Sequence, residues 1–150
     1  MANEPSATGW LSDATVVGDV RDGAPSSLRG IHTALTHARG PTLVVAWDMP
    51  FITTDLLELV LSRAGGAPAV IIENGAGVEG CCAYYAPAAL EVVARLLDAG
   101  EHRLTSLASA LPGCVRLPRP EIASAGDPSR LFFNVNTPDD LATANAMAGT

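Results

Sequence analysis

A chain of 150 residues that is 48% hydrophobic and only 17% charged has enough apolar side chains for a folded core, which excludes wholesale disorder. Its net charge of −7 argues against a general nucleic-acid surface, and its longest apolar runs are far short of a membrane span. Residues 1–10 lack the basic start and apolar centre of a signal peptide. We therefore expect one cytoplasmic domain over residues 1–150, with residues 1–14 irregular and with neither nucleic acid nor membrane as a partner.

The first part of the chain predicts a strand, a loop and a helix. Residues 15–18 are typical of a strand, which ends directly before Asp19. Residues 20–27 are rich in Gly, Pro, Ser and Asp and are expected to form a loop. The pattern then predicts a helix over residues 30–38, closed by Gly40.

A second unit of strand and helix follows. Residues 42–47 are largely apolar, which predicts a buried strand, and residues 48–50 (Asp-Met-Pro) turn the chain at its end. Thr53 or Thr54 is placed to cap the next helix. The apolar residues of that helix share one face: Leu56, Leu57, Val60 and Leu61.

The middle of the chain predicts two further strands before another helix. Residues 69–72 form an apolar run typical of a buried strand, and residues 74–75 (Asn-Gly) are a strong turn signal. A strand is expected over residues 81–85. The next helix is expected over residues 87–99, with Pro87 in its first position.

The C-terminal third predicts shorter elements and one capped helix. A helix is expected near residues 104–110 and a strand over 115–117, followed by a Pro-rich stretch as far as Pro128. Thr137 is suited to be the N-cap of the last helix, with Pro138 in its first position. Strands that alternate with helices predict an α/β fold with a largely parallel sheet and helices on both faces.

The three cysteines are an odd set without Cys-x-x-Cys spacing. Cys81, Cys82 and Cys114 therefore suit neither a disulfide framework nor a zinc site. Cys81 and Cys82 lie in an apolar strand-like run, where cysteine acts as a small hydrophobe. This pattern is typical of a reduced, cytoplasmic protein.

Asp48 is the most informative single residue, because it directly follows a buried strand. In an open α/β sheet, ligands bind in the crevice outside the carboxyl ends of the strands. Mg²⁺ held against nucleotide phosphates needs only one or two protein carboxylates, which suits Asp48. The alternative is a structural Asp that ends the strand and caps the following turn, a place where Asp is common.

Asp19 and the pair Asn134 and Asn136 also follow strand-like segments, the last pair coming after residues 131–133. If these strands are neighbours in a parallel sheet, their carboxyl ends meet at one crevice. Two carboxylates and an amide there would form an all-oxygen site for Mg²⁺ and a nucleotide. Each residue alone fits a turn equally well.

Two segments resemble motifs of the molybdenum cofactor guanylyltransferase family. Residues 48–52 (Asp-Met-Pro-Phe-Ile), followed by Asp55 and Leu56, look like that family's Asp-x-Pro-aromatic-Ile segment. Residues 133–141 (Phe-Asn-Val-Asn-Thr-Pro-Asp-Asp-Leu) are similar almost residue for residue to its closing motif. The resemblance runs from about residue 15 to residue 147, and the closing motif is its most specific part.

The resemblance implies a three-layer, Rossmann-like nucleotidyltransferase sheet with helices on both faces. It also implies transfer of GMP from Mg·GTP to molybdopterin cofactor with release of pyrophosphate. Asp48 would hold the Mg²⁺ and Asp19 would lie in the guanine-nucleotide pocket. Asn134 and Asn136 would line the active site as catalytic residues beside Asp48. Such a transfer is mostly positioning and charge neutralisation, which a metal and a few oriented polar groups supply.

One family feature has no counterpart here. Family members begin with a strand and a Gly-rich loop whose amides, Arg and Lys hold the triphosphate, whereas the segment before Asp19 contains no Lys or Arg. We therefore expect the fold to lack the first strand–loop–helix unit, and expect a protein partner or self-association to cover the surface this leaves. There are two alternatives. The chain could be a non-catalytic or truncated relative that serves as a binding or partner module, or it could be a transferase for another substrate.

Other side chains near these motifs have simpler interpretations. Arg21 and Arg29 flank the loop after Asp19 and are candidates for binding phosphate. Trp47 is expected to pack against the protein rather than to stack on a base. His32 and His37 are expected to be surface or helix-end residues, because their spacing does not suit a metal pair.

Overall fold

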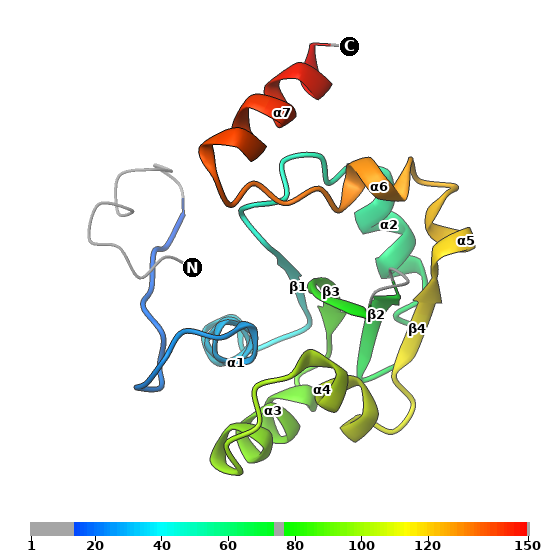
Figure 1. Ribbon diagram of the computed structural model, residues 1–150. Helices are drawn as coiled ribbons and strands as arrows, with labels where there is room; N and C mark the ends of the chain where they lie inside the picture. The colour runs from blue at the N-terminus through cyan, green and yellow to red at the C-terminus, as the bar shows by residue number, and fades with distance from the viewer. Residues whose placement is uncertain (1–13, 74–76, 150) are drawn as a thin grey trace.

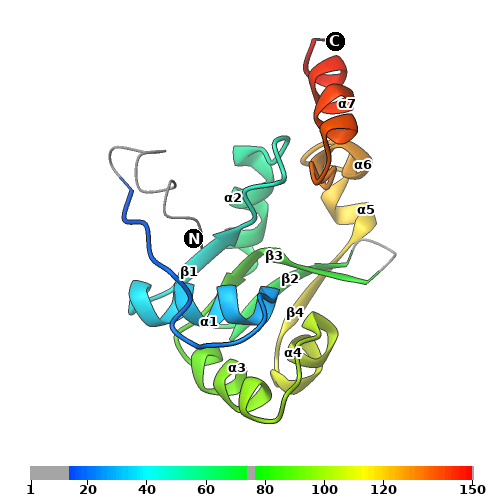
Figure 2. The ribbon, with the colours of Figure 1, turned by 60° about the vertical axis from the view of Figure 1, so that its left-hand side comes forward.

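The computed structural model describes residues 14–73 and 77–149, in which a four-stranded sheet lies between two groups of helices (Figures 1 and 2). The strands are β1 (Thr42–Val45), β2 (Ala69–Glu73), β3 (Val78–Tyr85) and β4 (Val115–Pro118), in the spatial order β1-β3-β2-β4. β3 pairs antiparallel with both β1 and β2, and β2 pairs parallel with β4.

The sheet is therefore less parallel than the alternation of strands and helices predicts. β2 and β3 follow each other without a helix between them, and a short connection joins strands in antiparallel fashion. β1, β2 and β4 still share one direction, since β1 and β2 are both antiparallel to β3. The turn predicted at residues 74–75 lies outside the described residues.

Helices cover both faces of the sheet, as the resemblance implies. α1 (Ser27–Ala38), α3 (Ala89–Asp98) and α4 (Leu104–Ala110) share one hydrophobic core with the sheet. α2 (Thr54–Ser62), α5 (Arg119–Ile122) and α6 (Pro128–Leu131) share a second core with its other face. α7 (Pro138–Ala148) extends away from these layers (Figure 1). None of the described helices is long and apolar enough to cross a membrane.

The two cores are separated by the alternation of side chains along β2. Ile71 packs into the core beneath α1, α3 and α4, and Ile72 packs into the core beneath α2 and α5. Both side chains are almost completely excluded from solvent. Successive residues of a strand point to opposite faces, so an apolar run without polar interruptions serves both cores.

The helix starts follow the local signals of the sequence. Ser26 caps α1 and Thr53 caps α2, each accepting a hydrogen bond from a backbone N–H of the first turn. Thr137 and Asp140 form a reciprocal capping box at the start of α7, with Pro138 in the first turn. The predictions of Thr53 and Thr137 as N-caps are confirmed.

Two predicted strands are absent from the described part of the chain. Residues 15–18 pair with no strand there, and the backbone N–H of Val20 instead donates to the hydroxyl of Thr33 on α1 (3.1 Å). The segment predicted as strand-like at residues 131–133 ends α6, because Asp127 caps a helical turn that starts at Pro128. In both segments the residues favour a strand locally, but no neighbouring strand in the described ranges pairs with them, so no strand forms.

The cysteines are free thiols, and Cys82 is fully buried in β3. Burial, together with a smaller effect of the nearby Glu79 carboxylate, raises the pKa of the Cys82 thiol to about 12. A thiol that stays protonated behaves as a small apolar side chain, which is the role predicted for it.

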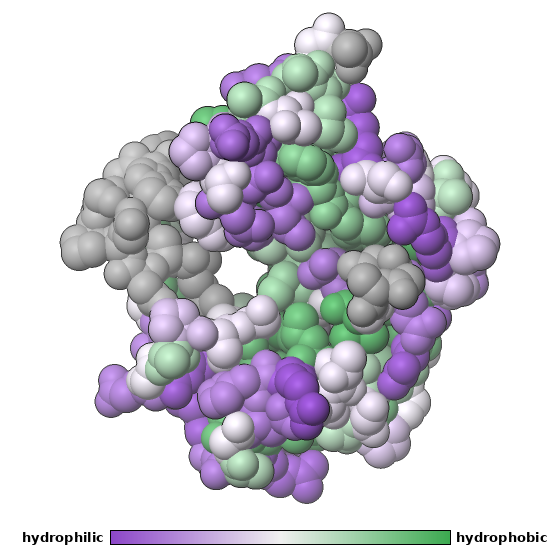
Figure 3. Space-filling model, viewed as in Figure 1, coloured by the Kyte–Doolittle hydropathy of each residue, from purple (hydrophilic) through white to green (hydrophobic). Residues whose placement is uncertain are grey.

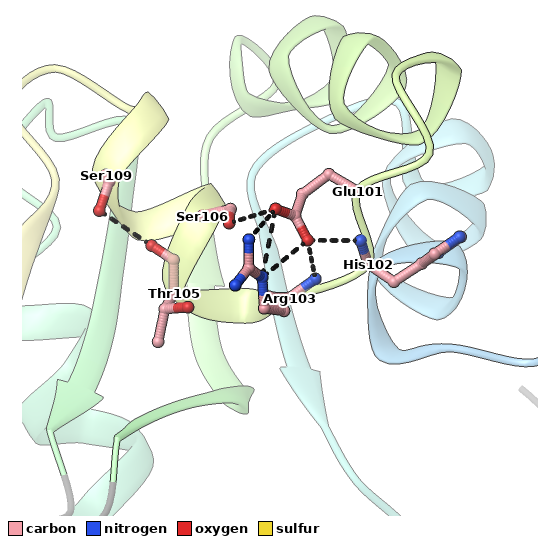
Figure 4. Close-up of polar contacts among 6 residues, drawn as sticks. All are labelled: Glu101, His102, Arg103, Thr105, Ser106 and Ser109. Carbon is pink, nitrogen blue, oxygen red and sulfur yellow. Dashed lines mark hydrogen bonds and ion pairs between the residues drawn. The ribbon is translucent and has the colours of Figure 1, made fainter.

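Glu101 holds the turn that leads into α4 (Figure 4). Its carboxylate accepts hydrogen bonds from the backbone N–H groups of His102 and Arg103, both at 2.9 Å, and from the Ser106 hydroxyl at 2.8 Å. The Arg103 guanidinium pairs with the same carboxylate (Nη2 to Oε2, 2.8 Å). These partners, the Arg103 side chain foremost, hold the pKa of Glu101 well below its usual range.

Truncation of Ile71 or Ile72 to alanine should lower the free energy of unfolding by about 2–5 kcal/mol, because each leaves a cavity in one of the two cores. Leu61→Ala is the matched control, since that side chain is 46% exposed, and it should cost much less. Urea unfolding of the three variants measures these changes in the free energy of unfolding. A small effect of either isoleucine variant would contradict the two-core arrangement.

Glu101→Gln should weaken the dependence of stability on pH. The pKa of Glu101 in the folded protein lies below its ordinary value of 4.5. The stability that the carboxylate contributes is therefore present above that value and lost as the pH falls through the folded pKa. Urea unfolding from about pH 6 to pH 3 should show a steeper fall for the unmodified chain than for Glu101→Gln. Glu91→Gln, on the exposed side of α3, should keep the steeper slope; parallel slopes for all three would refute this role.

Candidate functional site

A cavity of about 440 Å³ opens beside the carboxyl end of β1, a volume within the range of small-molecule sites. In Figure 3 the molecular surface is hollowed between α1 and the segment leading to α7, with apolar residues showing on the side of the sheet. Residues from α1, β1, β3, α4 and the segment before α7 line the cavity: Ser27, Gly30, Ile31, Val44, Val45, Ala46, Trp47, Asp48, Met49, Glu79, Cys81, Leu104, Asn134 and Asn136.

Asp48 lies on the cavity wall because β1 ends just before it. The backbone N–H of Ala46 still donates to the carbonyl of Cys81 on β3 (2.6 Å), and the chain then turns. Asp48 is half-buried in that turn, with its backbone held by the sheet on one side. Asp48 follows a strand and lies beside an open space, as the sequence predicts. The strand itself differs from the prediction, because β1 is at the edge of the sheet and is half-buried rather than buried.

Asn134 and Asn136 are brought to the same cavity by one backbone hydrogen bond. The N–H of Val135 donates to the carbonyl of Asp48 at 2.8 Å. Asn134 and Asn136 flank that anchored residue and both line the cavity. The expectation that these residues follow a neighbouring parallel strand is wrong, since they arrive on an irregular segment after α6.

Aromatic contacts reinforce this junction between distant parts of the chain. The rings of Phe51 and Phe133 lie 6.3 Å apart between centroids and are tilted by 59°. The guanidinium of Arg130 lies 4.8 Å from the centre of the Phe51 ring, within the range of a cation–π contact. The residues after Asp48 and those before Asn134 are therefore also held together by side-chain contacts next to the backbone hydrogen bond.

Asp19 is not among the residues that line this cavity. It lies against α1, where its carboxylate accepts a hydrogen bond from the Thr33 hydroxyl (3.4 Å). The structure therefore brings three of the four predicted site residues together and places Asp19 apart. The reason is that residues 14–19 join no strand in the described part of the chain, so no sheet edge carries Asp19 to the end of β1.

Neither arginine proposed for phosphate binding reaches the cavity. Arg21 forms an ion pair with Asp98 on α3 and donates from Nε to His32, which is buried. Arg29 lies beneath Gly23, where a Cβ would come within 2.0 Å of the guanidinium Nη2. Burial and the neighbouring Arg21 both lower the pKa of His32.

Sequence reasoning missed Glu79 as a site residue. Glu79 lies half-buried on β3 and accepts a hydrogen bond from the backbone N–H of Cys81 (3.4 Å). Burial raises the pKa of Glu79, the Cys81 hydrogen bond opposes that shift, and the Asp48 carboxylate adds to it. The available signal was a charged residue two positions before the predicted strand at residues 81–85.

Trp47 also differs from its prediction, because most of its side chain is exposed rather than packed in a core. It is 81% exposed and lines the cavity next to Asp48. The reason is that β1 ends at Val45, so Trp47 lies in the turn that follows and not in the sheet, where helices would cover it.

The oxygen donors of the cavity fit Mg²⁺ better than a transition metal. Asp48 and Glu79 supply carboxylates, and Asn134 and Asn136 supply amide oxygens. No cluster of three or more His, Cys, Asp or Glu side chains suited to a metal occurs in the described residues, whereas Mg²⁺ keeps most of its waters and needs only one or two carboxylates. No Lys or Arg is among the described residues that line the cavity.

Comparison with known proteins identifies the family of this chain. Residues 1–114 match the family described as the MobA-like NTP transferase domain. Two proteins named "Probable molybdenum cofactor guanylyltransferase", from Chloroflexus aggregans and Natronomonas pharaonis, are each 34% identical over 91% and 89% of this chain, and over 67% and 65% of their own lengths.

A solved structure supports the same relationship. The molybdopterin-guanine dinucleotide biosynthesis protein A of Archaeoglobus fulgidus superimposes with a TM-score of 0.72 and 32% identity, covering 83% of this chain and 63% of that protein. A further relative, from Pelotomaculum thermopropionicum, is covered over 59% of its length, so the chain spans about three fifths to two thirds of these proteins. The chain belongs to the family of MobA-like NTP transferase domains.

Proposed function

We propose that this chain contributes the active site for transfer of GMP from Mg·GTP to molybdopterin cofactor. The observation that carries the proposal is the meeting of Asp48, Asn134 and Asn136 on one cavity, through the hydrogen bond between Val135 and Asp48. The names of the relatives support the choice of guanine nucleotide and molybdenum cofactor as substrates. The cytoplasm is the proposed location.

The residues have separate roles in the proposed reaction. A terminal phosphate oxygen of molybdopterin attacks the α-phosphorus of GTP, the bond from that phosphorus to the bridging oxygen breaks, and pyrophosphate leaves. Asp48 would hold Mg²⁺, which supplies neutralisation of phosphate charge when bound. The amides of Asn134 and Asn136 would donate to phosphate oxygens and fix the reacting groups in line.

The cavity walls also favour such a transfer. Ile31, Val44 and Leu104 are among the apolar residues that line the cavity. Apolar walls exclude water from the reacting phosphates and strengthen the electrostatic interactions inside the site. Water is the competing acceptor in any phosphoryl transfer, so its exclusion directs the reaction towards the intended acceptor.

A partner module is the second candidate function, and one observation favours it. The described lining carries two carboxylates, Asp48 and Glu79, without a Lys or Arg to face a triphosphate. A transferase built on this cavity therefore needs cationic groups from elsewhere, in a second chain or outside the described residues. A module that only docks against another protein needs none.

Asp48→Asn should abolish Mg²⁺-dependent binding of GTP, because the amide keeps the shape of the side chain but loses its charge. For the unmodified chain, Mg·GTP at about 100 times its dissociation constant should stabilise the fold by about 2.7 kcal/mol, measured as a rise in the unfolding temperature. Asp48→Asn should show no such rise.

Asp55→Asn, in the exposed first turn of α2, is the matched control and should behave like the unmodified chain. If Mg·GTP leaves the unfolding temperature of the unmodified chain unchanged, the transferase proposal fails for this chain and the partner module is favoured. If Asp48→Asn is stabilised as much as the unmodified chain, the metal-binding role of Asp48 is wrong.

A further inference from the structure

Trp47 presents a large aromatic surface to solvent at the cavity. It is 81% exposed, and Val45 beside it is 42% exposed, although both line the cavity. A tryptophan face left in water forgoes the stabilisation that burial would give. Indole faces stack readily on flat heterocycles. Such stacking contributes to binding but does not discriminate between heterocycles by their hydrogen-bonding groups. The position of Trp47 is therefore suited to a planar ligand.

Glu79 supplies a carboxylate on the wall of the same cavity. Its backbone is held firmly by the next residue, Gly80, whose carbonyl accepts a hydrogen bond from the buried Tyr85 hydroxyl (2.8 Å). A Cβ on Gly80 would lie 2.8 Å from Leu104 Cδ2, so α4 packs directly on the strand at this point. One oxygen of the Glu79 carboxylate also accepts from the backbone N–H of Cys81 (3.4 Å), which orients the group, and each oxygen has a further lone pair with which to accept from a ligand.

A flat ring that carries two adjacent N–H donors on one edge matches both features. The 2-amino-4-oxopyrimidine ring has this edge, with a ring N–H beside an exocyclic amino group. Guanine and pterins share this ring, whereas adenine presents an acceptor nitrogen where guanine has the N–H. A carboxylate accepts from both donors at once, as it does in other bidentate pairs.

We propose that Trp47 and Glu79 form a recognition site for a 2-amino-4-oxopyrimidine ring. Trp47 stacks on the face of the ring, and the Glu79 carboxylate accepts from its ring N–H and amino group. The inference rests on the proposed function and deepens it, because it names the residues that select the substrate ring. The ring belongs either to the guanine nucleotide or to the pterin acceptor.

Calorimetric titration with Mg·GTP and Mg·ITP tests the role of Glu79, because inosine lacks the 2-amino group. The unmodified chain should bind GTP at least about ten-fold more tightly than ITP, as expected for a lost hydrogen bond to a charged acceptor. Glu79→Gln should reduce this ratio to about one. Glu91→Gln, on the exposed side of α3, is the matched control and should keep the ratio.

Fluorescence tests the role of Trp47. The chain has two tryptophans, so Trp10→Phe leaves Trp47 as the only one. Mg·GTP should quench its emission in that background if the stacked ring is guanine. Trp47→Ala should weaken binding of GTP and ITP by the same factor, about ten-fold, and Trp47→Phe should restore most of the loss.

Titration with 7,8-dihydroneopterin, a pterin without phosphate, distinguishes the two sources of the ring. If binding of 7,8-dihydroneopterin depends on Trp47 and Glu79, the site is assigned to the pterin. If instead the GTP-to-ITP affinity ratio depends on Glu79 and GTP quenches Trp47, the site is assigned to guanine. If neither ligand's binding responds to Glu79→Gln or Trp47→Ala, the inference is overturned, while stabilisation by Mg·GTP that depends on Asp48 would leave the proposed function standing. If no ligand binds the unmodified chain, both are overturned.

Discussion

The candidate site depends on the hydrogen bond from the Val135 N–H to the Asp48 carbonyl. It joins the turn after β1 to a segment near the C-terminal end of the chain, and it places Asn134 and Asn136 on the cavity that Asp48 also lines. The contact between Phe51 and Phe133 supports the same junction. A backbone bond is well suited to this task because it survives changes of side chain on either partner.

The antiparallel course of β3 determines what faces Asp48. Because β3 runs opposite to β1, its second half pairs with β1 and its first half extends past the end of β1, which brings Glu79 and Cys81 into the cavity. The Tyr85 hydroxyl and α4 then hold the strand at Gly80. Each core contributes indirectly, since the side chains of β2 and β3 alternate between them and fix the sheet from both faces.

Charge sets the limits on what the cavity can bind by itself. Two carboxylates favour a divalent cation and N–H donors, and they repel a bare triphosphate. The arginines nearest in sequence are engaged elsewhere: Arg21 pairs with Asp98, and Arg29 is enclosed beneath Gly23. Arg21 thus holds the loop after Asp19 against His32 of α1 and Asp98 of α3. Any phosphate-binding cation therefore has to come from outside the described lining.

Local sequence determined most of the secondary structure of this chain. The apolar runs of β1 and β2, the caps at Thr53 and Thr137, and Pro138 at the start of α7 act over a few residues, so pattern alone predicts them. The two motifs around Asp48 and Asn134 were also visible in the sequence, and their meeting was expected. The strand expected before Asn134 was wrong, because Asp127 and Pro128 favour a helical turn there.

Only the tertiary structure decided how the motifs meet and what surrounds them. The direction of β3, the bond between Val135 and Asp48, and the separation of Asp19 from the cavity depend on contacts between residues far apart in sequence. Glu79 and Trp47 line the cavity for the same reason, since the sequence around a charged strand residue or an aromatic turn residue does not show what it will face. Which side chains share a cavity is decided by strand order and register, and no local pattern encodes these.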